Sequence, residues 1–134
     1  MDATLSKWQP LALSLLRFIT ALVLFQFGMA KILRIPELAY FANIPTLIQV
    51  AGWIELILGG LLLIGLFTRI VAFILSGEMA FAYFLGHMFK SGEPVWLPLN
   101  NGGTAAILFC FACLYLATAG GGPISADAMM GKKG

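Results

Sequence analysis

The sequence predicts an all-α integral membrane protein, a bundle of four transmembrane helices forming a single domain over residues 1–134. Three observations predict this fold class. Hydrophobic residues make up 60% of the chain and charged residues only 10%, whereas soluble domains average about 25% charged residues. The mean hydropathy is +0.95. Four segments qualify as spanning helices of roughly 20 apolar residues, and none alternates as a membrane β-strand would.

The first three helices are predicted from apolar runs and the breaks between them. The first run ends before a loop that Pro36 and Pro45 bracket. The second and third runs are joined almost without a loop, so they form an antiparallel hairpin. These helices are predicted over residues 11–33, 46–67 and 68–89.

The fourth helix is predicted over residues 103–119, after a connection rich in Gly, Pro and Asn. Glycines followed by Pro123 end it, because glycine closes a helix and proline prevents its continuation. Residues 123–134 are expected to form a tail.

Charge in the loops predicts the orientation of the chain in the membrane. Four spans place both termini on one side of the bilayer. The positive-inside rule favours a cytoplasmic location for the side with more Lys and Arg. We therefore expect a bacterial inner-membrane protein with cytoplasmic termini, since that side carries Lys7, Arg69, Lys132 and Lys133 and the other carries Lys31, Arg34 and Lys90.

Five ionisable side chains lie within the predicted helices. Each costs roughly 2.5–3.5 kcal/mol at the bilayer centre even on lenient scales, so such groups are paired, hydrated or functional. They are Arg17, Lys31, Glu55, Glu78 and His87.

The tight turn at residues 67–68 predicts how deep the two acids lie. Glu55 and Glu78 lie at similar distances along the chain on either side of it, so they reach nearly the same depth. Arg17 enters from the same side of the membrane and has a long side chain that can reach inward. We predict that Arg17 pairs with Glu55, Glu78 or both. Whether this is a structural ion pair or part of a functional site stays open.

Two small-residue faces predict how the first and second helices pack. Helical spacing places Gly28 and Lys31 on the Arg17 face of the first helix. Glycine permits close approach of a neighbouring membrane helix. The matching face of the second helix is predicted to contain Gly52, Glu55, Gly59 and Leu63.

Lys31 and His87 are expected at the opposite membrane side, at the mouth of the bundle. Lys31 either extends to the interface or binds a ligand, and His87 either bonds to the last loop or contacts a polar headgroup. Cys110 and Cys113 form a Cys-x-x-Cys pair within an apolar helix. They are interpreted as packing residues, since free cysteine behaves as a small hydrophobe; thiol exchange is the alternative.

Several cofactors and partners are excluded by composition. A single histidine excludes a haem held by two histidines of this chain, and two cysteines cannot hold an iron–sulfur cluster alone. No G-x-G-x-x-G motif follows a strand, so no nucleotide cofactor is expected. No metal site is predicted. A net charge of +2 without a basic run among aromatics excludes nucleic acid as a partner.

A series of short motifs, from about Leu11 to Asp127, resembles the DoxX family of small four-helix membrane proteins. The resemblance implies an inner-membrane protein related to thiosulfate:quinone oxidoreductase subunits, with quinone as its cofactor. Glu78 and the two cysteines lie outside the family pattern. The motifs are Arg17, Gly28-x-x-Lys31, Glu55-x-x-x-Gly59-Gly60, Gly65-Leu66-x-Thr68-Arg69, Met79-Ala80, His87 and Gly122-Pro123-x-Ser125-x-Asp127.

The function that we expect is that of a quinone-linked redox subunit with a pocket among the first three helices. Lys31, Trp53, Glu55 and His87 are the predicted quinone-binding residues. Glu55, Glu78 and His87 are the candidates for catalytic proton transfer. The expected partners are the lipid bilayer and a partner redox subunit or a second copy of the chain. The alternatives are a non-catalytic membrane assembly subunit and a small proton-coupled transporter.

Overall fold

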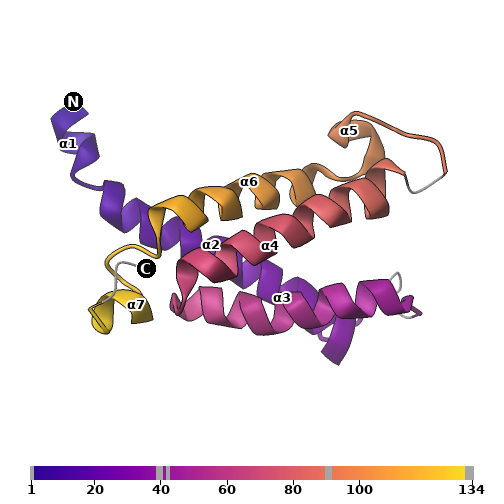
Figure 1. Cartoon of the computed structure of the whole chain (residues 1–134), viewed down its shortest axis with the longest axis horizontal. Coiled ribbons are helices and arrows are strands. Elements are labelled where there is room, and N and C mark those ends of the chain that lie inside the picture. The colour runs from indigo at the N-terminus through magenta and orange to yellow at the C-terminus, as the bar shows by residue number, and fades with distance from the viewer. Residues whose placement is uncertain (1, 39–40, 42, 90–91, 132–134) are drawn as a thin grey trace.

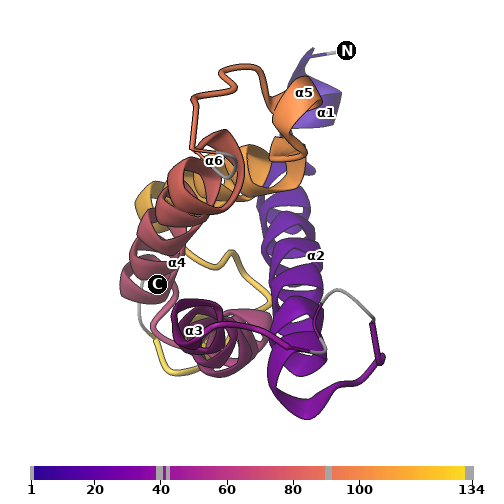
Figure 2. The ribbon, with the colours of Figure 1, turned by 90° about the vertical axis from the view of Figure 1, so that its right-hand side faces the viewer.

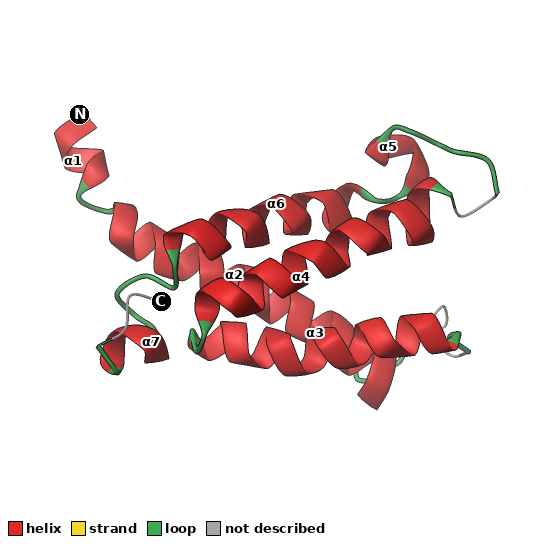
Figure 3. Ribbon diagram, in the orientation of Figure 1, coloured by secondary structure: helices red, strands yellow, loops and turns green. Residues whose placement is uncertain are grey.

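The computed structural model describes residues 2–38, 41, 43–89 and 92–131, and all regular structure in these residues is helical (Figure 3). Lys90, Lys132 and Lys133, which contribute to the predicted orientation, lie outside the described residues. Two of the helices end in a wider π-helical turn, η1 and η3. The elements are α1 (Asp2–Ser6), α2 (Gln9–Gly28), η1 (Met29–Leu33), α3 (Thr46–Ile64), α4 (Thr68–Tyr83), η3 (Phe84–Met88), α5 (Pro98–Asn101), α6 (Thr104–Ala119) and α7 (Ala126–Met129).

Among the described residues, three helices are long and apolar enough to cross a membrane: Gln9–Leu33, Thr46–Ile64 and Thr68–Met88. The predictions of an all-α fold and of membrane-spanning helices are confirmed to this extent, and the first three predicted ranges match within a few residues. The fourth predicted span corresponds to α6, which is apolar but only 16 residues long. Because a span needs roughly 20 residues, helix length does not establish a fourth crossing.

The helices pack as two pairs, α2 with α3 and α4 with α6. A tight turn joins α3 to α4, and α4 and α6 diverge from α3 away from that turn (Figure 1). In the second view α2 runs along one side of the molecule, and α3 is seen nearly end-on (Figure 2). The buried core lies where the pairs meet. Its residues are Ala21, Leu24, Leu62, Val71, Ala72, Leu75, Met79, Cys113 and Leu116.

The contact between α2 and α3 depends on glycines. A Cβ atom added to Gly28 would lie 2.4 Å from the backbone nitrogen of Leu56, and one on Gly59 would lie 3.1 Å from that of Phe25. At Gly28 the two backbones lie closer than a side chain would allow, and at Gly59 a side chain would fit only if Phe25 shifted slightly. Gly52, Glu55 and Gly59 are buried on α3, as predicted; the fourth buried residue of that face is Leu62.

Gly28→Ala is expected to destabilise the protein by about 1–3 kcal/mol, the usual cost of overpacking. The added methyl group would meet the α3 backbone, which cannot rotate away. The matched control is Gly77→Ala, because nothing lies within 4 Å of a Cβ there and alanine favours a helix by up to about 1 kcal/mol. Reversible unfolding in mixed detergent and SDS micelles measures both. Equal stability of the two variants would contradict the close contact.

The chain after α6 folds back across the end of the bundle where α3 meets α4. Helix α6 ends at Ala119 with Gly120 next, as the glycine run predicts. Gly122 has a φ of +82°, and a Cβ there would lie 2.2 Å from the Ser14 hydroxyl. Helix α7 follows, and Asp127 within it is only 1% exposed. This packing differs from the tail expected over residues 123–134.

Candidate functional site

A buried ion pair joins η1 to α3. The Lys31 ammonium donates to both carboxylate oxygens of Glu55, at 2.8 Å and 3.0 Å. The Glu55 side chain is 1% exposed and that of Lys31 is 14% exposed. Bidentate, charge-assisted bonds of this length are the strong kind. Two of the three N–H donors of Lys31 are therefore occupied, and the third has no hydrogen-bond partner among the described residues.

Local structure brings Lys31 against α3. Gly52 lies opposite it, because a Cβ on Gly52 would be 2.8 Å from the Cβ of Lys31. The ammonium also lies 5.8 Å from the ring centre of Phe27 and 5.7 Å from that of Phe41, within the range of cation–π attraction. The π-helical turn that holds Lys31 is a feature often found at functional sites. Glycine packing, aromatic rings and the carboxylate together fix this ammonium.

Glu78 on α4 lies beside this ion pair. It is close enough to Glu55 and Lys31 to interact electrostatically with both. Both of its carboxylate oxygens are buried, and neither has a hydrogen-bond partner among the described residues. The turn at residues 67–68 therefore brings the two acids together, as predicted. In the described part of the chain, the cluster consists of two carboxylates and one ammonium.

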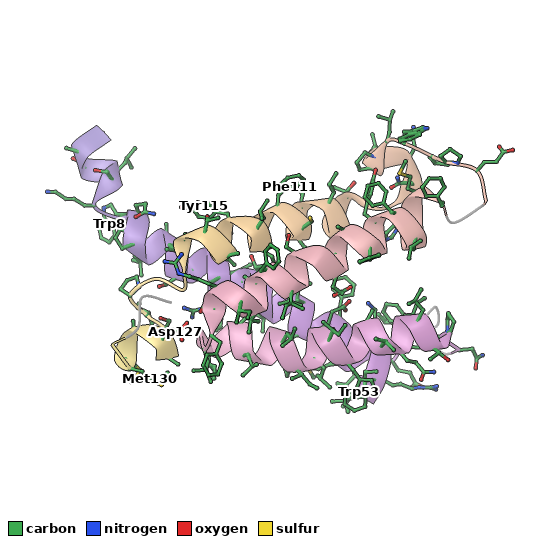
Figure 4. The ribbon with its side chains drawn as sticks, in the orientation of Figure 1. Trp8, Trp53, Phe111, Tyr115, Asp127 and Met130 are labelled. Atoms are coloured by element: carbon green, nitrogen blue, oxygen red, sulfur yellow. The ribbon has the colours of Figure 1, made fainter. Side chains whose placement is uncertain are left out.

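An open pocket of about 670 Å³ adjoins the ion pair on the side of Lys31. Trp53 lines it and projects from α3 away from α4 (Figure 4). Two of the predicted quinone-binding residues, Lys31 and Trp53, thus line one pocket, and Glu55 lies behind Lys31. The full lining is Lys31, Ile32, Arg34, Asn43, Ile44, Pro45, Gln49 and Trp53.

The polar residues of this lining were missed by the sequence reasoning. Gln49 precedes Trp53 by four residues, so one helical face carries both. Arg34 and Asn43 belong to the loop between η1 and α3. Arg34 and Gln49 lie within one helical turn of Lys31 and Trp53, so helical spacing could have identified these two; Asn43 lies too far from both residues for that signal.

His87 does not line this pocket. It belongs to η3, and its Nδ1 atom would lie 3.9 Å from a Cβ on Gly102, close to the start of α6. The structure therefore places His87 beside the last loop, which is the position that the sequence suggested for a bonding rather than a ligand-binding role. It is not brought together with Lys31, Trp53 and Glu55.

The predicted ion pair between Arg17 and Glu55 or Glu78 is wrong. Arg17 is 4% exposed, and its guanidinium donates to backbone carbonyls instead, to Gly121 at 2.6 Å, Ile124 at 2.8 Å and Leu63 at 3.3 Å. The carbonyls of the C-terminal segment reach Arg17 at its own shallow depth. The Arg17 guanidinium is therefore bound at that depth and does not extend to Glu55 or Glu78.

Asp127 supplies the opposite charge at this end of the bundle. Its carboxylate accepts hydrogen bonds from the backbone N–H groups of Phe67 and Thr68, both at 2.9 Å, and it attracts Arg17 electrostatically. It thus caps the N-terminus of α4, where a carboxylate is favoured. Figure 4 shows Asp127 next to the turn between α3 and α4. These contacts hold the C-terminal segment against the turn between α3 and α4, which is a structural role.

The cysteines lie within the helix packing. Both thiols are free, and Cys113 is fully buried in the core. The Ser76 hydroxyl donates to the Cys110 carbonyl at 2.7 Å, which ties α4 to α6. These contacts favour the interpretation of both cysteines as packing residues.

Comparison with known proteins places this arrangement in a family. The family model described as DoxX matches residues 12–88, the part of the chain that holds Lys31, Glu55 and Glu78. An uncharacterized protein of Haemophilus influenzae is 39% identical over 132 residues, which is 96% of this chain and 98% of the relative. No solved structure matches significantly. Since the family model covers more than half of the chain and the relative covers nearly all of it, the protein belongs to the DoxX family.

Proposed function

We propose that the protein is an inner-membrane, quinone-binding redox subunit whose ligand lies in the pocket beside Lys31. The observation that carries this proposal is the third N–H donor of Lys31, which has no hydrogen-bond partner in the described part of the chain. That ammonium is fixed by Glu55 and also lines the pocket. A quinone carbonyl needs such a donor, and the ammonium has three.

The pocket fits a quinone headgroup in size and chemistry. Its volume of about 670 Å³ lies within the roughly 300–1,000 Å³ of small-molecule sites. Arg34, Asn43 and Gln49 add polar groups, and the Trp53 ring offers a flat apolar surface. Apolar side chains of α3, such as Ile57, are exposed, so an isoprenoid tail in the bilayer can pack against them.

A bound quinone supplies reversible transfer of two electrons and two protons. Lys31 binds and orients the headgroup, Glu55 holds Lys31 in place, and Trp53 covers one face of the ring. The electrons pass to or from a partner redox subunit. His87, which lies outside the pocket, has no part in this proposal.

We further propose that α6 is the fourth crossing and that both termini are cytoplasmic. Helix α6 packs along α4, and large apolar residues such as Leu108 and Phe111 are exposed on its outer side. Lipid contact explains this exposure better than water does.

The test uses Trp53 as a reporter. In a variant with Trp8→Phe and Trp96→Phe, Trp53 is the single tryptophan. Titration with a short-tailed benzoquinone or naphthoquinone is expected to give saturable quenching, and Gln49→Leu is expected to weaken binding about tenfold, or roughly 1.4 kcal/mol. The matched control keeps Trp96 and replaces Trp8 and Trp53, and its fluorescence should not saturate. Lipid extracts of the purified protein should contain quinone; no quinone and no saturation would contradict the proposal.

A second function, that of a non-catalytic assembly subunit, is favoured by one observation. The Lys31–Glu55 pair bridges η1 and α3, and so holds two helices together. If the protein is such a subunit, replacing Lys31 and Glu55 by apolar residues should leave the activity of the whole complex unchanged.

A further inference from the structure

Glu78 is a partly buried acid, and the proposed quinone site gives it no role. Its oxygens are buried and lack hydrogen-bond partners in the described part of the chain. Glu55 faces it from α3, Lys31 from η1 and Cys113 from α6. From α2, Arg17 is the described ionisable residue, and it is bound at the opposite end of the bundle. Glu78 therefore shares its surroundings with one ammonium that already binds another carboxylate.

The charges of this cluster do not balance if both acids are ionised. One ammonium would then face two carboxylates, and an ionised group without hydrogen bonds is costly away from water. A proton on Glu78 makes the cluster neutral. It also gives Glu78 an O–H donor, with the Glu55 carboxylate beside it as an acceptor. The Glu55 carboxylate accepts both Lys31 bonds, so the proton belongs on Glu78.

Lys31 connects this cluster to solvent. Its side chain is 14% exposed and lines the open pocket, whereas Glu55 is 1% exposed. A proton leaving Glu78 can therefore reach water that enters from the pocket.

We propose that Glu78 is a proton-binding site in the membrane interior, which exchanges one proton with the pocket by way of Glu55 and Lys31. The step makes and breaks only O–H bonds: the proton passes from the Glu78 carboxyl to water, and the charge of the cluster changes from zero to minus one. No electron moves. The inference goes beyond the quinone-binding function and does not depend on a bound quinone.

The test is modification of the full-length protein, in detergent and lipid, by dicyclohexylcarbodiimide. This apolar reagent adds to protonated carboxyl groups and rearranges to a stable N-acylurea, which peptide mass spectrometry locates. We expect an adduct on Glu78 whose rate of formation falls about tenfold per pH unit above the point of proton release, as for one titrating group. Glu55, ionised and bound to Lys31, should remain unmodified. Glu37, an exposed loop acid in the same protein, is the internal reference for the rate of adduct formation.

Two variants sharpen the result. Glu78→Gln should remove the adduct, and Lys31→Met should add a second adduct on Glu55. The wild-type measurement stands if either variant fails to fold. An adduct on Glu55 in its place, no adduct on Glu78, or a rate on Glu78 that does not change with pH would each overturn the proposal. Quinone titration gives a separate readout, so failure of either proposal is seen independently.

Discussion

Lys31→Met is expected to destabilise the folded protein by about 3–5 kcal/mol, the cost of breaking a buried ion pair by removing one partner. The Glu55 carboxylate loses both of its bonds to the ammonium while it stays 1% exposed. Glu78 lies beside it and can supply no compensating positive charge. Free energies from unfolding in mixed detergent and SDS micelles measure the loss.

A double-mutant cycle separates the pair from its parts. Combining Lys31→Met with Glu55→Leu is expected to recover most of the stability, because apolar residues of similar volume often replace a buried pair at little cost. The matched control is Lys7→Met, since Lys7 is exposed and should show no measurable change. If the double variant is as unstable as the sum of the single variants, the two residues are not coupled, and the ion pair does not hold η1 to α3.

This cycle also weighs the two proposed functions. A double variant that folds normally but no longer binds quinone would place Lys31 in ligand binding. A double variant that folds and remains active in its complex would favour the assembly role.

The depth of the two acids could be predicted because a tight turn fixes it. Helices α3 and α4 are joined through Gly65, which has a φ of +74°, and three residues leave no freedom in the register of the hairpin. Counting residues from the turn therefore brings Glu55 and Glu78 together, as the structure has them.

The partner of Glu55 could not be predicted in the same way. A loop of a dozen residues joins η1 to α3, so chain length does not fix the register between α2 and α3. Backbone contacts fix it, with Gly28 against Leu56 and Gly59 against Phe25. This register places Lys31 at the level of Glu55. The same register places Arg17 far from Glu55, beside Gly65.

The role of the C-terminal segment could not be predicted from the sequence either. Helix periodicity describes spans, and residues 121–127 form none. Their motif with Gly122, Ser125 and Asp127 was recognised only by resemblance. Its physical meaning appears once backbone carbonyls and a carboxylate are seen to satisfy Arg17 and the start of α4.

Asp127→Ala is expected to destabilise the protein by about 3 kcal/mol or more, since each of two charge-assisted hydrogen bonds contributes about 1.5–3 kcal/mol. The amides of Phe67 and Thr68 at the start of α4 would lose their acceptor, and Arg17 would lose the negative charge near it. Hydrogen exchange at the two amides and unfolding in mixed micelles measure the effect. Glu37→Ala, at an exposed acid, is the control.

Asp127→Asn then separates hydrogen bonding from charge. Its amide oxygen can still accept one of the two N–H bonds, whereas the negative charge opposite Arg17 is lost. A cost between those of wild type and Asp127→Ala would mean that capping of α4 carries most of the stabilisation. An equal cost in the Ala and Asn variants would assign it to the charge. Asp127→Ala with the stability of the Glu37 control would show that the C-terminal segment does not lock this end of the bundle.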